Sequence, residues 1–357
     1  MVLEQKEKRS AHGHSGHPVS LSTLTCLPGN TDVSAHIEPY RHELCLHCYR
    51  MMGSLHDAED LVQETMLRAW QRFDTFREAA SLRTWLYAIA THLCLDALKK
   101  PQRRTLPMAS YPAADPAEPI AVPTPDAPWL EPFPSLWLEE ATDNPETRYT
   151  RRETVSLAFL IALQLLPPRQ RAVLILSDVL DWHASEVARL LDMSVSAVNS
   201  ALHRARVTLA RNYQATEPER TLVHADAATD ALLKRYIYAW ENDDIAGLVA
   251  LLKEDATLNM PPYPSWYAGR EAIGTLLAAT ALGTGIEHLW RMYPTGANAR
   301  PAVALYRACP SKHCYEAFGI QIVTPDDARQ PAQIAAITSF HRSSLVAAFG
   351  FPPQIPA

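Results

Sequence analysis

Two groups of polar side chains have types and spacing that could support chemistry. In the first group, Cys45 and Cys48 are three residues apart, which would bring both thiols to one face of a helix, with His42 and His47 nearby. Thiols and imidazoles at such spacing bind zinc when a second pair completes the tetrahedron. We find no distant partner pair, and small thiols are commonly buried in protein cores. We therefore predict no metal site.

The second group is acid–base in type and lies in the C-terminal third of the chain. It consists of His288, Glu316 and His341. Acid–base catalysis needs a carboxylate or imidazole with a perturbed pKa, placed opposite an oxyanion donor. Nothing in the spacing of these three residues pairs them. We predict no catalytic residue and no cofactor, and we expect that the chain is not an enzyme.

Aromatic and basic side chains gather between residues 70 and 104. Unpaired nucleic-acid bases stack on aromatic rings, and lysines and arginines attract phosphates. The composition therefore suits single-stranded nucleic acid, although the same helical spacing also suits a protein core. The aromatic residues are Trp70, Phe73, Phe76, Trp85 and Tyr87, and the basic residues are Lys99, Lys100, Arg103 and Arg104.

A second nucleic-acid signal lies between residues 182 and 211. A short helix over 182–191, a turn at 192–194 and a helix over 195–211 would form a helix-turn-helix, with Ser194 as the N-cap. An ordinary helical hairpin is the alternative. On the outward face of the second helix, small polar residues precede arginines, an order that suits base edges and then phosphates. These residues are Ser196, Asn199, Ser200, His203, Arg204 and Arg206.

Composition divides the chain into blocks that differ in charge. The whole chain has 33 basic and 39 acidic residues and a net charge of −6, which by itself argues against nucleic-acid binding. Residues 105–145, however, contain seven acidic residues, no basic residue and nine prolines between Pro107 and Pro134. This acidic linker holds the negative charge, because residues 36–104 sum to +1 and residues 146–213 to +3. An extended tether is expected for such a segment.

Specific motifs in both helical blocks resemble those of extracytoplasmic-function sigma factors of the sigma-70 family. Residues 57–65, 68–70 and 81–90 closely resemble region 2 of that family, and residues 166–171 and 194–206 resemble region 4. The resemblance implies a sigma region 2 over 31–104 and a sigma region 4 over 146–213. It also implies two partners, core RNA polymerase and promoter DNA.

The resemblance implies a division of roles among these residues. Asp60, Gln63 and Glu64 would dock on the clamp helices of the polymerase β′ subunit, and the linker would thread through polymerase channels. The helix-turn-helix residues named above would read the −35 element. His92 stands where many relatives carry Asn, and His183 stands where many carry Ser. The residues implied at the −10 element are Phe76, Arg83, Trp85, His92, Lys99 and Lys100.

The C-terminal block is expected to be an α+β domain. Helices are expected over 226–252 and 269–277, and strands over 256–260, 302–306, 316–323 and 334–340. The residues at 236–240, 254–257, 260–262 and 266–270 form a pattern similar to that of SnoaL-like domains, which have a cone-shaped, nuclear-transport-factor-2-like fold with a pocket. The resemblance implies such a domain over 222–352. Candidate pocket residues are Tyr236, Trp240, Met260, Trp266 and Tyr267.

We therefore expect a multidomain protein in which a disordered tail (residues 1–30) precedes two all-α sigma domains and one α+β domain. No signal peptide or apolar stretch of membrane-spanning length is evident, so we expect a cytoplasmic location. Our hypothesis is an alternative sigma factor restrained by its C-terminal domain or by a separate anti-sigma factor. The alternatives are a SnoaL-like sensor or enzyme tethered to DNA, and a plain helix-turn-helix regulator.

Overall fold

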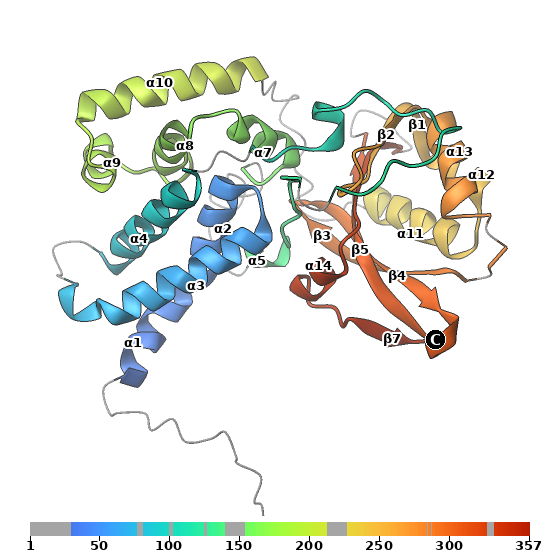
Figure 1. Cartoon of the computed structure of the whole chain (residues 1–357), viewed down its shortest axis with the longest axis horizontal. Helices are drawn as coiled ribbons and strands as arrows, with labels where there is room; N and C mark the ends of the chain where they lie inside the picture. The colour runs from blue at the N-terminus through green and yellow to red at the C-terminus, as the bar shows by residue number, and fades with distance from the viewer. Residues whose placement is uncertain are drawn as a thin grey trace, which may run out of the picture.

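The structure is a computed structural model that divides visibly into a helical half and a sheet-containing half (Figure 1). Of the tail expected over residues 1–30, residues 1–29 lie outside the described residues, as does Lys100, whereas Asn30 begins the first helix. The described residues are 30–76, 81–99, 103–124, 127–139, 154–212, 227–283, 285–286, 288–326 and 332–357. Within these ranges, no helix is both long enough and apolar enough to cross a membrane.

The first helical block, residues 30–99, is built from four α-helices whose ends are set by local hydrogen bonds. Ser54 and Ser81 cap the two longest helices, each accepting a backbone N–H three residues later at 3.1 Å. Gly53, with φ of 72°, ends the preceding helix in the left-handed conformation. The helices are α1 (Asn30–Ile37), α2 (Arg41–Met52), α3 (Leu55–Gln71) and α4 (Leu82–Ala97).

The second helical block, residues 154–212, contains the expected helix-turn-helix. Ser194 Oγ accepts the Ala197 N–H at 3.1 Å, which confirms the expected cap. The earlier helix starts firmly although His183 replaces a serine, because the Glu186 carboxylate accepts the His183 N–H at 2.9 Å. The elements are α7 (Leu157–Gln164), α8 (Pro168–Leu174), a π-helical turn (Ile175–Val179), α9 (Ala184–Leu191) and α10 (Val195–Asn212).

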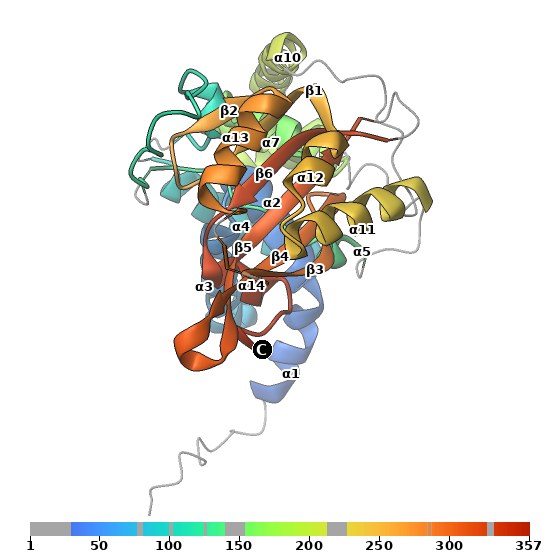
Figure 2. The same cartoon turned by 90° about the vertical axis from the view of Figure 1, so that its right-hand side faces the viewer.

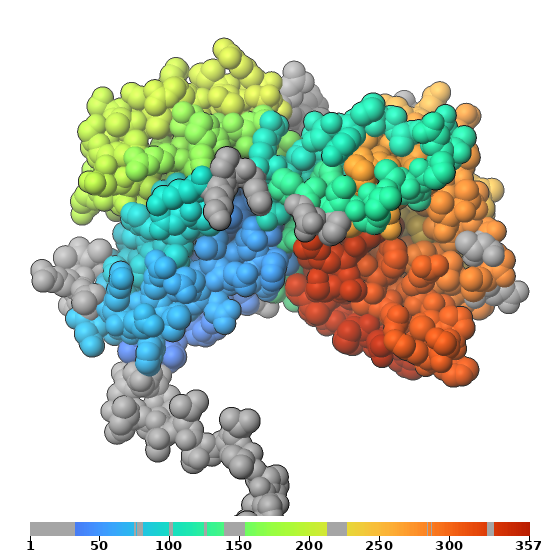
Figure 3. Space-filling model, in the orientation of Figure 1, coloured from blue at the N-terminus to red at the C-terminus, as the bar shows by residue number. Residues whose placement is uncertain are grey.

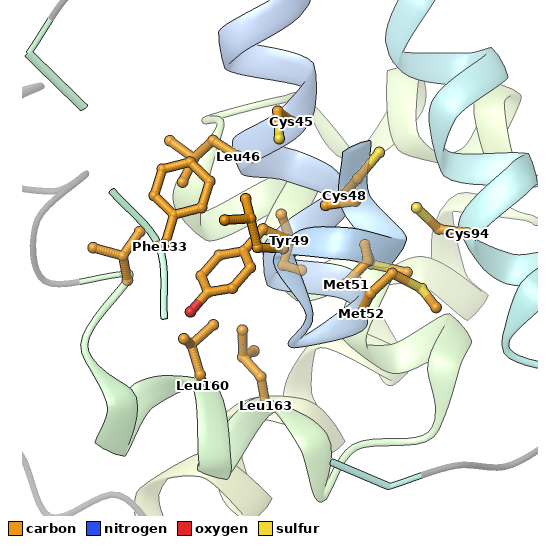
Figure 4. Packing of buried hydrophobic residues seen from close by; sticks show 14 of the residues in the cluster. Cys45, Leu46, Cys48, Tyr49, Met51, Met52, Cys94, Phe133, Leu160 and Leu163 are labelled. Atoms are coloured by element: carbon orange, nitrogen blue, oxygen red, sulfur yellow. The ribbon is translucent and has the colours of Figure 1, made fainter. Parts of the chain in front are cut away.

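The two helical blocks share one buried core. Tyr49 on α2 lies among Phe133, Leu160 and Leu163, which come from the linker and from α7 (Figure 4). Arg171 on α8 is buried and donates to the Met51 carbonyl of α2 and to Gln164 Oε1. Burial lowers the pKa of Arg171 to about 10, yet the guanidinium stays charged at neutral pH.

The C-terminal domain, residues 227–357, is a curved sheet with three helices on one face, as expected for an α+β cone. The sheet order is β2-β1-β6-β5-β4-β3, in which only β1 and β6 run parallel, and β7 pairs with β5. Its helices are α11 (Ala227–Glu241), α12 (Ile245–Leu251), α13 (Arg270–Thr280) and α14 (Ser343–Ala348). Its strands are β1 (Leu252–Asn259), β2 (Trp266–Ala268), β3 (Trp290–Ala297), β4 (Arg300–Cys309), β5 (Cys314–Pro325), β6 (Ile334–Phe340) and β7 (Gln354–Pro356).

This domain contains four elements that were not expected, β2, β3, β7 and α14, and one expected helix is divided. The single helix expected over 226–252 is two helices, because the Asp244 side chain accepts the Gly247 N–H at 2.8 Å and starts α12. Strand β3 was not expected, since Pro294 and Gly296 weaken the strand signal. The sheet tolerates Pro294 because β3 is an edge strand.

Alternate residues of the sheet face two different cores. On β4, Val303 and Leu305 pack with α11, α12 and α13, whereas Ala302, Ala304 and Tyr306 belong to the core that also contains the helical blocks. The C-terminal domain therefore buries its second sheet face within the same apolar cluster as the helices.

The linker has little regular structure, as expected, but it is bound along its length rather than loosely extended. Thr105 and Trp129 form a parallel bridge that closes a loop, and Pro134 bridges Ala297 at the edge of β3. Besides a 3₁₀ turn at Pro107–Ala109, its described residues, 105–124 and 127–139, contain one short helix, α5 (Leu136–Glu139). The loop lies over the C-terminal domain near β1, β2 and α13 (Figures 1 and 2). In the space-filling view it covers part of that domain's surface (Figure 3).

Candidate nucleic-acid interfaces

The outward face of α10 has the geometry of a recognition helix. All six predicted side chains are exposed, while Val198, Ala201 and Ala205 are buried on the opposite side. The predicted residues at helix positions 196, 199, 200 and 203 therefore lie on one solvent-facing surface. Arg206 is held by Asp178, with Nη2–Oδ1 at 2.6 Å and Nε–Oδ2 at 2.9 Å, so it is oriented before any ligand binds.

An aromatic cluster lies where α3 ends and α4 begins. The ring centroids of Phe76 and Trp85 are 5.4 Å apart, and Phe73 lies 6.1 Å from Phe76 and 6.5 Å from Trp85. All three side chains are half-buried, so they leave ring surface exposed to solvent. Exposed ring faces of this kind can stack on unpaired bases.

The other residues predicted for the −10 element are only partly brought together. His92 is exposed on α4, and its Nδ1 donates to the Ala88 carbonyl at 2.7 Å, which leaves Nε2 as an acceptor for a ligand. Lys99 is exposed and pairs with Asp96 at 2.8 Å.

Two arginines that the sequence grouped with this site pair within the protein. Arg83 forms an ion pair with Glu43 at 2.9 Å and lies 4.8 Å over the Tyr87 ring. Arg104, grouped with the basic residues by sequence, pairs with Asp57. The structure therefore gives both arginines a structural role, and a DNA contact by Arg83 stays a prediction.

The exposed side of α3 has a mixed polar and apolar surface. Asp60 and Gln63 are exposed, and Glu64 pairs with Arg68 at 2.6 Å. Sequence reasoning missed that Leu67 and Trp70 continue this face, with 48% and 40% of each residue exposed. The recurrence of positions 60, 63, 67 and 70 was the available signal. Large exposed apolar groups bordered by acids are typical of a protein-docking surface.

The thiol and imidazole cluster has the environment of a core. Cys45, His47 and Cys48 are buried, and His47 Nε2 lies 2.9 Å from Thr91 Oγ1. Burial raises the pKa of Cys45 well above its usual value and lowers that of His47 to about 3. Across the described parts of the chain, no three His, Cys, Asp or Glu side chains gather closely enough to hold a metal.

Asn298 connects the C-terminal domain to three other parts of the chain, and no sequence pattern predicted this role. It lies in the turn between β3 and β4, is 1% exposed, and has a φ of 52°, which Asn tolerates better than most residues. Its Nδ2 donates to Tyr49 Oη at 2.8 Å and to the Val155 carbonyl at 2.7 Å, and its Oδ1 accepts the Phe133 N–H at 2.9 Å. The C-terminal domain is thereby hydrogen-bonded to both helical blocks and to the linker.

Glu131 makes a second connection of this kind. Its Oε2 accepts the Ser54 hydroxyl at 2.8 Å and the His56 N–H at 3.0 Å, at the start of α3. Its Oε1 accepts from Arg342 of the C-terminal domain at 2.5 Å. Because Glu131 is 6% exposed, this carboxylate depends on those partners for solvation.

Two of the five predicted pocket residues line a cavity of about 200 Å³ in the C-terminal domain. Trp240 and Met260 line the cavity directly, whereas Tyr236 lies behind it and donates to Gln321 Oε1 at 2.8 Å. Trp266 donates its indole N–H to the Tyr111 carbonyl of the linker at 2.7 Å. Tyr267 is buried outside the lining.

The three acid–base candidates do not form one site. His341 lines the cavity, Glu316 pairs with Lys312 at 2.6 Å, and His288 is exposed in the segment before β3. This separation leaves no acid–base pair at the cavity among these three residues.

Known protein families match both helical blocks. Residues 36–105 match the family described as Sigma-70 region 2, and residues 156–209 match the family described as Sigma-70, region 4. The aromatic cluster and the α3 face fall within the first match, and α10 falls within the second.

Similarity to individual proteins extends over most of the chain. The sequence is 43% identical over 327 residues to the ECF RNA polymerase sigma factor SigG of Mycobacterium tuberculosis, covering 91% of this chain and 85% of that protein. It is 30% identical over 220 residues to SigJ of the same organism, covering 62% of each chain. The crystal structure of SigJ superposes with a TM-score of 0.53 at 22% identity and covers 89% of this chain and 99% of that one. At that identity, the superposition supports the shared fold, including most of the C-terminal domain.

Proposed function

The chain belongs to the extracytoplasmic-function RNA polymerase sigma factors, and we propose that three surfaces described above divide the work of promoter-specific initiation. The exposed face of α3 binds core RNA polymerase. The aromatic cluster, together with His92 and Lys99 on α4, holds unpaired bases of the −10 element. The outward face of α10 reads the −35 element in the major groove.

The observation that carries this proposal is the presence of all three surfaces in one chain. A plain helix-turn-helix regulator needs only the α10 face and has no use for ring faces that can stack on single strands. The partly apolar face of α3, next to those rings, supplies a surface for a large protein partner. The protein functions with core polymerase in the cytoplasm, and we assign it no catalytic step.

We further propose that the described arrangement is a closed, resting form. The two helical blocks, which we propose bind separate DNA elements, share one buried core here. The ring centroids of Tyr87 on α4 and Trp182 beside α9 are 5.7 Å apart. The linker connects the two helical blocks. The C-terminal domain binds this linker through Asn298 and through the pair of Arg342 with Glu131. Release of the linker would let the two helical blocks move apart on DNA and polymerase.

Run-off transcription with purified core polymerase tests the central proposal. We expect specific transcripts from a promoter template with the full chain, and none with core polymerase alone. A template with a scrambled −35 element is the matched control. Absence of specific initiation from every promoter fragment that the chain and core polymerase bind together would contradict the proposal.

The cavity in the C-terminal domain favours one other function, a small-molecule sensor tethered to DNA. Such a sensor would bind DNA through α10 without polymerase. Footprinting with and without core polymerase separates the two functions, because a sigma factor protects both elements only in the presence of the polymerase.

A further inference from the structure

The cavity of the C-terminal domain is apolar but not uniformly so. It lies between the sheet and the helices α11 and α13, and its apolar walls include Leu258, Leu277, Leu305, Trp290 and Phe318. A protein cavity of about 150 Å³ with apolar walls can stay dry and hold a benzene ring. The volume of about 200 Å³ therefore suits a molecule of one or two rings.

A buried polar atom at this cavity, His341 Nδ1, has no hydrogen-bond partner among the described residues. Trp240 also lines the cavity, but its indole interacts with the buried Tyr236 hydroxyl, which lies outside the lining. His341 Nε2 is used, since it lies 2.8 Å from Ser339 Oγ. Buried polar atoms are nearly always satisfied, so an unsatisfied imidazole nitrogen at a largely apolar cavity indicates a bound group that supplies its partner.

The linker forms part of the cavity wall. Ile120 lines it, and the flanking backbone is fixed to the C-terminal domain. The Ala114 N–H donates to the Trp266 carbonyl at 2.8 Å, and the Thr124 N–H donates to the Pro262 carbonyl at 2.9 Å. The Ala121 N–H reaches Ser265 Oγ at 3.3 Å. A molecule in the cavity would therefore contact the same segment that joins the two helical blocks.

We infer that this cavity binds a small, ring-containing molecule with a hydroxyl or carbonyl group, which bonds to His341 Nδ1 beneath the linker. The imidazole can complement either a donor or an acceptor, according to its tautomer. Burial lowers the pKa of His341 to about 4, so the ring is neutral at neutral pH and can form a hydrogen bond rather than an ion pair. The exposed Arg307 also lines the cavity.

Binding and linker release oppose each other, because Ile120 leaves the wall when the linker leaves. A ligand at ten times its Kd would lower the population of the released linker about elevenfold, if release requires ligand loss. The regulatory meaning of this coupling rests on the proposed function, in which the linker must leave for initiation. The binding itself does not rest on it.

The binding test uses the full chain and 1-naphthol as the probe, with naphthalene as its apolar match. By isothermal titration calorimetry, we expect 1-naphthol to bind about fivefold more tightly, because one net hydrogen bond contributes about 1 kcal/mol. The variant His341→Phe should lose most of that difference while it still binds naphthalene. Equal affinity for both probes, or a preference that persists in His341→Phe, would overturn the inference.

Hydrogen exchange tests the coupling to the linker without polymerase or DNA. We expect 1-naphthol to slow exchange over residues 108–124 in the full chain. The effect should be weaker in Ile120→Ala and unchanged in Val122→Ala, because Val122 is 80% exposed in the same segment. Unchanged linker exchange at saturating probe would refute the coupling. Since neither measurement involves transcription, failure here is distinguishable from failure of the sigma-factor proposal.

Discussion

Asn298 shows how one side chain can join parts of the chain that are remote in sequence. Its left-handed turn suits the two-residue connection between β3 and β4, and its amide satisfies groups on the linker and both helical blocks. In the sequence it is one of several asparagines with no neighbouring pattern. Its partners are 143 to 249 residues away, so its role depends entirely on tertiary contacts.

His47 gives a residue-scale prediction for pH dependence. Burial holds its folded-state pKa at about 3, while an unfolded chain has a value near 6.5. The folded state therefore binds fewer protons between these values. Stability should be fully present above pH 6.5 and fall by about 1.4 kcal/mol per pH unit on acidification from this residue alone.

The variant His47→Gln should remove this contribution, because Gln can still reach Thr91 but does not titrate. Urea unfolding at pH 4.5, 5.5 and 6.5 measures the slope, with His92→Gln as the exposed control on α4. A slope for His47→Gln equal to that of the parent would show that His47 is not neutral in the folded state.

At the scale of elements, α10 carries both sequence reading and backbone attraction. We predict that Asn199→Ala reduces the base-pair preference at one position of the −35 element and costs about 1–3 kcal/mol of binding free energy at the preferred sequence. Arg204→Ala should instead weaken binding to all sequences alike and lower the slope of log affinity against log salt concentration by about 0.9. Promoter binding by the polymerase complex over a salt series measures both effects, with Lys234→Ala on α11 as the control. Identical behaviour of the two α10 variants would contradict this division of roles.

The exposed face of α3 gives a second element-scale prediction. Replacing Leu67 with Gln should weaken core-polymerase binding about tenfold, since a central apolar contact in an interface contributes about 1.4 kcal/mol or more. The same change at Leu136, which is 62% exposed on α5, is the matched control. Competition binding against labelled parent protein gives the ratio. Equal affinities for the two variants would remove α3 as the docking surface.

At the scale of the whole molecule, the linker connects the helical half to the sheet-containing half. It is hydrogen-bonded to the start of α3, to the β3–β4 turn and to the loop of the C-terminal domain before β2. One face of the sheet lies in the same apolar cluster as the helical blocks. Complete deletion of the C-terminal domain would expose that face, so point substitutions in the contacts are sharper tests of restraint.

Arg342→Leu is the whole-molecule prediction. The change removes one partner of the buried Glu131 carboxylate, and we expect it to destabilise the closed form by about 1 kcal/mol, because the Arg342 side chain is partly solvated. This destabilisation would raise the population of the open form about fivefold. It should appear as a larger radius of gyration in small-angle scattering and as higher transcript yield. Lys234→Ala is again the control, and an unchanged radius with unchanged yield would show that this contact does not restrain the protein.

The sequence by itself determined the local structure and the family. Helical periodicity, the Ser194 cap and the run of small polar residues before arginines depend on neighbours within a few residues, so they predicted α10 and its exposed face. The motifs on α3 and α4 likewise predicted the family that the comparisons show. Strand β3 was not predicted, because its proline is acceptable only in an edge strand. Sequence alone does not reveal which strand lies at the edge of the sheet.

Only the tertiary structure decided how the acidic linker and the C-terminal domain are used. Charge and proline content indicated a segment without long helices or strands, which holds for its described residues, 105–124 and 127–139, but they carry no information about distant partners. Buried contacts of Glu131, Asn298 and Ile120 join residues far apart in the chain, and their strength comes from exclusion of water. Exclusion of water is a property of the assembled fold, which is why the held linker and the cavity beneath it emerged only from the structure.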